Sequence, residues 1–293
     1  MAPKKTNKEP LPRTLVFDGC SWGCVYYLGV YDALHAEHTP TSFAQCRWGG
    51  WSSGALFALA GALYKTPDEC RALLEEMSAV AERNGVFGNM SIYHDVALLR
   101  WLPDDGREWA RLNERLWVGV TRSVARFEWV TRWTSNADVR ATIHGSMHLP
   151  YYMTCTDLVQ GRRAIDGGFA FTRAAARIDD HTTQVSATRL SADIHPVPAL
   201  TLSQCFSPVP RTQRRVLERR GYEDAVRQFQ APRKVKPDGA LTARSPLRCR
   251  RLALCVVGWA LRWCEERRRT TWYGLALLLL LLLARRAATR GSV

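Results

Sequence analysis

The sequence predicts an α/β domain in which a mostly parallel sheet is covered by helices on both faces. Between residues 14 and 230, short apolar runs alternate with longer segments whose apolar residues recur at helical spacing. Two of the runs, at residues 14–19 and 46–51, carry glycine towards their carboxyl ends and lead directly into a helical segment. Strand, glycine turn and helix in this order form the repeating unit of parallel sheets.

The first unit joins a buried strand at residues 14–19 to a helix over residues 21–35. The second unit continues with residues 52–64, which are apolar on nearly every side and predict a buried helix. Another helix is expected over residues 66–83, because Pro67 suits the first helical position and acidic residues follow it.

The remaining chain up to residue 230 shows weaker patterns. Residues 92–102 are amphipathic, and the turn Pro-Asp-Asp-Gly follows at 103–106. A helix is expected over residues 135–146, with Ser135 as its N-cap. Other β-rich segments predict a hairpin, from residues 116–121 and 127–133, and short strands at 153–156, 163–165 and 183–187.

The positive charge of the chain is confined to its two ends. The formal net charge is +14, from 41 basic and 27 acidic residues. Residues 1–13, expected to be a disordered arm, carry four basic residues and one acid, whereas residues 14–230 carry 23 of each. Residues 231–293 carry 14 basic and three acidic residues. A neutral body argues against a basic nucleic-acid-binding domain, so no nucleic-acid partner is expected.

The C-terminal residues predict a linker and a membrane anchor. Residues 231–250 are basic and contain proline, and residues 251–293 hold apolar segments at 252–261 and 272–284 on either side of the charged sequence EERRR. Thirteen apolar residues in a helix span about 20 Å, which is short of the ~30 Å bilayer core. The segment at 270–284 therefore either spans the bilayer under strain or lies in one leaflet. An apolar helix packed on the preceding domain is the alternative.

Gly50-Trp51-Ser52-Ser53-Gly54 has the pattern G-x-S-x-G between a predicted strand and a predicted helix. That context is the one in which a sharp turn exposes the serine hydroxyl, and glycine on each side permits close backbone approach. The motif predicts Ser52 as a nucleophile, with Gly50 and Gly54 forming the elbow. The alternative is a loop of small residues between packed elements.

Two other loops carry candidate chemistry. The backbone N–H groups of residues 18–24, between the first strand and the first helix, can form an anion-binding nest. Asp166-Gly167-Gly168 follows the apolar Ile165, so the aspartate can project from a strand end into a cleft. Each loop taken alone is also compatible with a plain turn.

Together these three sites resemble the patatin-like phospholipases, most closely the adipose triglyceride lipase branch. The matching residues are TLVFDGCSWGCVYYLGV at 14–30, GWSSGAL at 50–56 and AIDGG at 164–168, in the order of the family. Softer similarity extends the resemblance to residues 14–230. It implies a patatin-like three-layer α/β/α catalytic domain over those residues.

The resemblance also implies a Ser–Asp dyad. Ser52 matches the nucleophile, Asp166 the general base, and the amides of Gly19, Cys20 and Ser21 the oxyanion hole. Gly167 and Gly168 complete the Asp-Gly-Gly motif. The implied reaction is hydrolysis of glycerolipid esters, triacylglycerol or phospholipid, through an acyl-enzyme in lipid catabolism, without a metal or cofactor. The implied location is an endomembrane or lipid-droplet surface, with the catalytic domain facing the cytosol; no protein partner is indicated.

Two substitutions depart from the family pattern, because Ser21 and Cys24 stand where it has glycine. They keep open a degenerate, lipid-binding protein as an alternative. A Ser–His–Asp hydrolase using His181 or His195 is the other alternative, since both follow Asp166 in the chain. The other histidines are expected at the surface or as helix caps: His35, His38, His94, His144 and His148.

Overall fold

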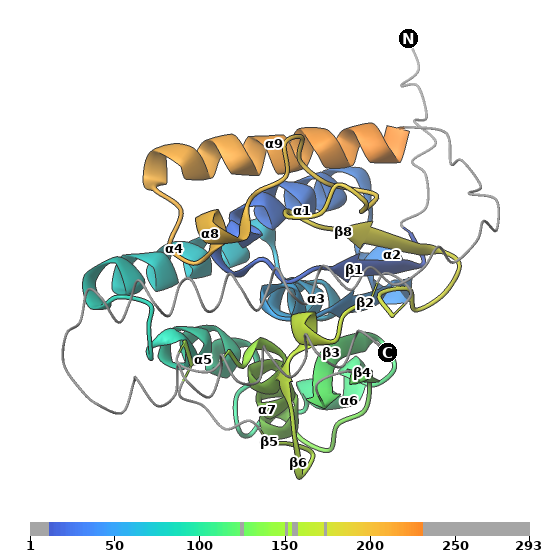
Figure 1. Ribbon diagram of the computed structural model, residues 1–293. Coiled ribbons are helices and arrows are strands. Elements are labelled where there is room, and N and C mark those ends of the chain that lie inside the picture. Colours follow the sequence, from blue (N-terminus) through green and yellow to red (C-terminus); the bar gives the residue numbers. More distant parts are fainter. Residues whose placement is uncertain (1–11, 124–125, 150–151, 154–157, 173–174, 231–293) are drawn as a thin grey trace, which may run out of the picture. The chain divides into compact units, whose positions relative to one another are not determined.

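The main sheet contains six strands in a computed structural model that describes residues 12–123, 126–149, 152–153, 158–172 and 175–230. Its strands follow the order β4-β3-β2-β1-β8 (Figure 1). Strand β7 pairs with β3 beside this path. The strands are β1 (Thr14–Phe17), β2 (Arg47–Gly50), β3 (Leu116–Ser123), β4 (Arg126–Val130), β7 (Ile165–Asp166) and β8 (Thr182–Val185). A separate small pair consists of β5 (Leu158–Val159) and β6 (Arg162–Arg163).

The sheet is mixed, with four parallel strands and two antiparallel ones. Strands β1, β2, β3 and β8 are parallel, as the two strand–turn–helix units predicted. The predicted hairpin forms between β3 and β4 and is antiparallel, as a direct hairpin must be. Strand β7 also runs antiparallel to β3, with Asp166 opposite Val120.

The helices agree with the predicted segments at most positions, with boundaries shifted by a few residues. Ser135 caps α7 as predicted, because its side chain accepts a hydrogen bond from the Asp138 amide. Helices α2, α6, α8 and α9 were not predicted. The helices are α1 (Val25–Glu37), α2 (Pro40–Gln45), α3 (Ser53–Leu63), α4 (Pro67–Asn84), α5 (Met90–Trp101), α6 (Glu108–Leu112), α7 (Asn136–Met147), α8 (Leu202–Cys205) and α9 (Arg211–Gln230), with short 3-10 turns η1 (Ser21–Cys24) and η2 (Gly167–Phe169).

The two faces of the sheet carry different cores. Leu15 and Phe17 of β1 belong to the large core that includes side chains of α1, α3 and α7. Val16, between them, points to the other face, where Trp51 and Ala176 form a smaller cluster with neighbouring aromatic rings. The connection from β1 to β2 and the connection from β2 to β3 run in the same direction across the sheet. Because connections of this kind are right-handed, the helices within both connections lie on the same face of the sheet. Among the described residues, loop segments rather than helices cover the smaller cluster, unlike the expected three-layer arrangement.

Helix α9 lies along α1 in direct backbone contact (Figure 1). A Cβ placed on Gly29 would lie 1.7 Å from the Glu218 carbonyl oxygen, and one on Gly221 would lie 2.0 Å from the Tyr26 carbonyl oxygen. Only glycine fits at both positions. Arg71 of α4 adds ion pairs to Asp32 of α1 at 2.7 Å and to Glu218 at 2.5 Å.

The predicted ends of the chain lie outside the described residues. This holds for the arm at 1–13 except its last two positions, for the linker at 231–250 and for the anchor at 251–293. Within the part of the chain that the structure describes, no helix is both long and apolar enough to span a bilayer. The membrane anchor therefore stays a prediction.

Candidate active site

Ser52 lies in the sharp turn between β2 and α3. Its backbone has φ 53° and ψ −138°, a conformation that L-residues adopt only when the surrounding structure enforces it, at about 1–3 kcal/mol. A Cβ on Gly50 would lie 2.3 Å from the Gly54 carbonyl oxygen, and one on Gly54 would lie 2.3 Å from the Phe17 carbonyl oxygen. The two motif glycines are thus required by the close passage of backbone around the elbow.

Ser146 of α7 holds the elbow in place, and this residue was not predicted from the sequence. The Ser52 amide donates hydrogen bonds to the Ser146 carbonyl oxygen at 3.2 Å and to Ser146 Oγ at 3.0 Å. Ser146 Oγ in turn donates to the Gly119 carbonyl oxygen of β3 at 2.7 Å. Ser146 is a positioning residue for Ser52, and its position at the end of a helix gives no sequence signal for this role.

Asp166 is buried beside Ser52, at 5% exposure. Burial is the main cause that raises the pKa of Asp166 to about 6; hydrogen bonding from the Ser52 side chain and the Gly168 amide lowers this pKa, and the nearby charge of Asp18 adds a smaller rise. The Gly168 amide donates to Asp166 Oδ1 at 2.8 Å. A carboxylate with a pKa of about 6 beside a serine hydroxyl is suited to accept the proton of that hydroxyl.

The loop at residues 18–24 lies against Ser52, because a Cβ on Gly19 would be 2.7 Å from the Ser52 Cβ. Two of the three predicted oxyanion amides have partners within the protein. The Gly19 amide donates to Asp18 Oδ1 at 2.8 Å, and the Cys20 amide donates to Ser53 Oγ at 3.0 Å. Ser21 has φ 47°, a backbone region that favours glycine, so the departure from the family pattern falls on a strained position.

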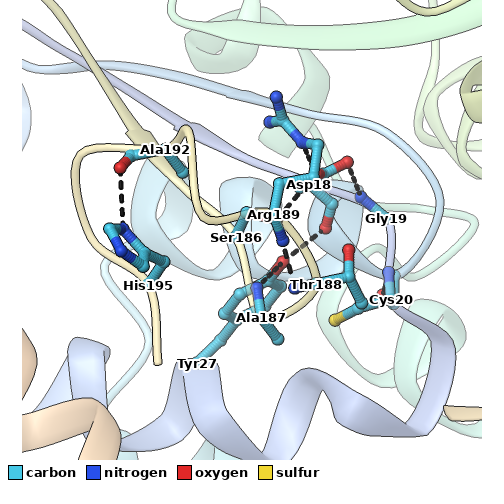
Figure 2. A network of polar contacts seen from close by, with 11 residues as sticks. Asp18, Gly19, Cys20, Tyr27, Ser186, Ala187, Thr188, Arg189, Ala192 and His195 are labelled. Carbon is cyan, nitrogen blue, oxygen red and sulfur yellow. Dashed lines mark hydrogen bonds and ion pairs between the residues drawn. The ribbon is translucent and has the colours of Figure 1, made fainter. Parts of the chain in front are cut away.

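A buried ion pair between Asp18 and Arg189 fixes the start of this loop, as Figure 2 shows. Asp18 Oδ2 also accepts a hydrogen bond from Ser186 Oγ at 2.8 Å, and the Asp18 carbonyl oxygen accepts one from the Tyr27 hydroxyl at 2.8 Å. The Arg189 guanidinium packs over the Phe171 ring, 4.5 Å from its centre. Arg189 was not predicted, because it comes from a loop 171 residues further along the chain.

An apolar cavity of about 60 Å³ opens beside the serine candidate. Ser21, Ser52, Ser53 and Tyr152 contribute the hydroxyl groups of its lining. Apolar side chains from the helices make up most of the remaining wall, including Leu56, Leu73, Met77, Ala97, Trp101 and Met147. A cavity of this chemistry next to a nucleophile suits a hydrocarbon chain.

The structure does not bring the two histidines of the alternative triad to Ser52. Exposed His181 precedes Thr182, which pairs with Thr14 at the amino end of β1, whereas Ser52 follows the carboxyl end of β2. His195 Nδ1 lies 2.8 Å from the Ala192 carbonyl oxygen, and Figure 2 shows this pair apart from Gly19 and Cys20.

The expectation for the other histidines was wrong at two positions, because His94 and His144 are buried inside α5 and α7. His38 and His148 are the C-caps of α1 and α7, as expected. His94 faces inwards because Met90, Ala97 and Trp101 share its side of α5 at helical spacing, a pattern readable from the sequence. Among the described residues, no group of three His, Cys, Asp or Glu side chains could hold a metal ion.

Comparisons with known proteins identify a family for this chain. A family model described as patatin-like phospholipase matches residues 15–176. Among solved structures, VipD from Legionella pneumophila aligns with a TM-score of 0.41 at 13% identity, covering 76% of this chain and 67% of that chain. The heterodimeric ExoU–SpcU complex from the type III secretion system of Pseudomonas aeruginosa aligns with a TM-score of 0.44 at 13% identity, covering 94% and 67%. The search of curated proteins finds no match.

Proposed function

Because the chain belongs to the patatin-like phospholipase family, we propose that it is a serine lipid acyl hydrolase with Ser52 as nucleophile and Asp166 as general base. The observation that carries the proposal is the pairing of a strained, elbow-mounted serine with a buried carboxylate whose pKa is raised to about 6. A dyad of this kind needs no histidine and no metal.

The reaction proceeds in two halves. Ser52 Oγ attacks the ester carbonyl carbon while its proton passes to Asp166, and the carbonyl oxygen takes the negative charge. The C–O bond to the alcohol then breaks, and Asp166 returns the proton to the departing alkoxide. In the second half Asp166 takes a proton from water, the hydroxide attacks the acyl carbon, and Ser52 leaves with that proton as the fatty acid is released.

The substrate in this proposal is a glycerolipid ester. The cavity beside Ser52 suits the acyl chain, and its apolar wall gives no preference between head groups. Resemblance to the adipose triglyceride lipase branch favours triacylglycerol, and the family match favours phospholipid. A membrane or lipid-droplet surface, with residues 231–293 as anchor, is the proposed working site.

A fluorophosphonate probe tests the dyad. Labelling of the wild-type protein should disappear in Ser52→Ala and persist in Ser53→Ala, which removes the neighbouring hydroxyl but not the nucleophile. Hydrolysis of a lipid panel should be lost in Ser52→Ala and in Asp166→Asn. A wild-type protein that neither labels nor hydrolyses any ester would overturn the proposal.

A catalytically degenerate lipid-binding protein is the second candidate. Two observations favour this candidate. The Gly19 and Cys20 amides already donate hydrogen bonds within the protein, so an oxyanion would have to displace these bonds. Ser21 also has a side chain at a backbone conformation that favours glycine. This candidate predicts vesicle binding without labelling. Pelleting with vesicles, measured with and without residues 231–293, also tests the anchor: binding that is unchanged by the truncation would exclude it.

A further inference from the structure

His94 places a polar ring in the wall of the apolar cavity that Ser52 also lines. Its side chain is only 6% exposed, and it extends from α5 together with apolar neighbours. Histidine is an unusual choice for such a wall, because burying a polar group without a hydrogen bond is unfavourable.

The ring has an unused nitrogen. His94 Nδ1 is buried and has no hydrogen-bond partner among the described residues. The other polar ring in the wall differs, since the Tyr152 hydroxyl is bonded to Trp22 Nε1 at 3.0 Å, to Ser21 Oγ at 3.2 Å and to the Phe206 carbonyl oxygen at 3.3 Å. Of the side chains described in this cavity wall, His94 alone has a buried, unpaired nitrogen or oxygen.

The chemical state of the ring narrows the choice of ligand. Burial, assisted by the neighbouring His144, lowers the pKa of His94 to about 3, so the imidazole is neutral at physiological pH. A neutral imidazole has one donor nitrogen and one acceptor nitrogen, and either tautomer is available to Nδ1. A hydroxyl group can donate or accept and therefore matches both tautomers, whereas a carbonyl or ether oxygen matches one.

We propose that this cavity binds acyl chains that carry a hydroxyl group, and that His94 Nδ1 is the hydrogen-bond partner of that hydroxyl. The inference rests on the proposed function, because it takes the cavity as the acyl-chain site of the Ser52 hydrolase. The competing occupant is a water molecule shared with the Nδ1 of His144, which is also buried and unpaired and whose ring centre lies 6.4 Å from that of His94. A water held in this way predicts no preference for hydroxylated chains.

The test compares 4-nitrophenyl dodecanoate with a series of 4-nitrophenyl esters of dodecanoic acid bearing one hydroxyl at successive carbons. For wild-type protein, kcat/KM for at least one hydroxylated ester should exceed that of the plain ester by about 3-fold to 10-fold, the gain from one neutral hydrogen bond. His94→Phe should abolish this preference while still cleaving the plain ester. Met77→Leu, a change of similar volume elsewhere in the wall, should alter both esters together and leave the ratio unchanged.

Two conservative variants separate recognition from packing. His94→Asn keeps a hydrogen-bonding atom near the position of Nδ1 and should keep part of the preference. His94→Gln moves that atom towards the position of Nε2 and should lose more of it. A purely structural role for His94 would instead change stability in all variants without changing the ratio.

A binding assay makes the inference independent of turnover. Ser52→Ala protein is titrated with dodecanoic acid and with the hydroxydodecanoic acids, and the affinity ratio is compared with that of Ser52→Ala/His94→Phe. If no ester is cleaved, the proposed hydrolase fails, and the binding ratio still decides the hydroxyl site. A ratio that His94→Phe leaves unchanged in both assays, or a wild-type preference for plain chains throughout, would overturn the inference alone.

Discussion

Replacing Asp166 by asparagine should stabilise the fold at neutral pH while abolishing hydrolysis. The carboxylate is buried, and its charge has no opposite partner among the groups that shift it; the charge of Asp18 acts against it. Asparagine keeps an oxygen that can accept the Gly168 amide hydrogen bond and removes the charge.

The magnitude follows from the pKa. Burial raises the pKa of Asp166 from 3.8 to about 6, which at about 1.4 kcal/mol per pKa unit corresponds to about 3 kcal/mol. The folded state binds a proton more tightly than the unfolded state, so the free energy of unfolding falls as pH rises from about 4 to about 6 and then stays level. Asp166→Asn should therefore gain up to about 3 kcal/mol at pH 8 and almost nothing at pH 4.

Urea unfolding of both proteins at pH 4 and pH 8 measures this difference. Asp18→Asn is the matched control, because it makes the same chemical change at a buried carboxylate that does have a partner, Arg189. That variant should lose about 3–5 kcal/mol, since it leaves Arg189 buried and unpaired. The reasoning would be refuted if Asp166→Asn were less stable than wild type at pH 8. It would also be refuted if the free energy of unfolding differed between the two proteins by the same amount at both pH values.

Three more predictions concern the same site. The kcat/KM for ester hydrolysis should fall about tenfold per pH unit below about pH 6, because Asp166 must be ionised to act as a base; a flat profile down to pH 4 would exclude it. Ser21→Gly should raise the thermal midpoint and Ser21→Val should lower it, because φ is 47° there; the opposite order would show that the Ser21 hydroxyl outweighs the backbone. Gly54→Ala should eliminate fluorophosphonate labelling, because its Cβ would lie 2.3 Å from the Phe17 carbonyl oxygen; normal labelling would show that the elbow can relax.

Features encoded by local patterns were predictable from the sequence. The strand–turn–helix units around Gly19 and Ser52, the β3–β4 hairpin and the Ser135 cap each depend on residues close together in the chain. The site residues that were missed depend on distant partners. Ser146 meets Ser52 across 94 residues, and Arg189 meets Asp18 across 171, so neither contact leaves a periodic signal.

In the sheet and in the acyl cavity, too, the features that depend on tertiary contacts could not be predicted from local patterns. Antiparallel β7 is only two residues long, too short for its alternation to reveal a direction, yet it carries Asp166. The spacing of Met90, His94, Ala97 and Trp101 indicates the buried side of α5. His94 was nevertheless predicted at the surface or as a cap, because histidine is polar. Tertiary burial overrode that preference.

The pairing of the first elements with the last ones has a consequence for how the chain matures. Strand β1 lies between β2 and β8, and α1 lies against α9 through Gly29 and Gly221. As the ribosome synthesises the protein, one edge of β1 therefore stays unpaired until β8 has been made, and the side of α1 that contacts α9 stays uncovered until about residue 230 has emerged. We expect the nascent chain to need protection by chaperones throughout that interval, and C-terminal truncations that enter α9 to aggregate rather than yield a smaller enzyme.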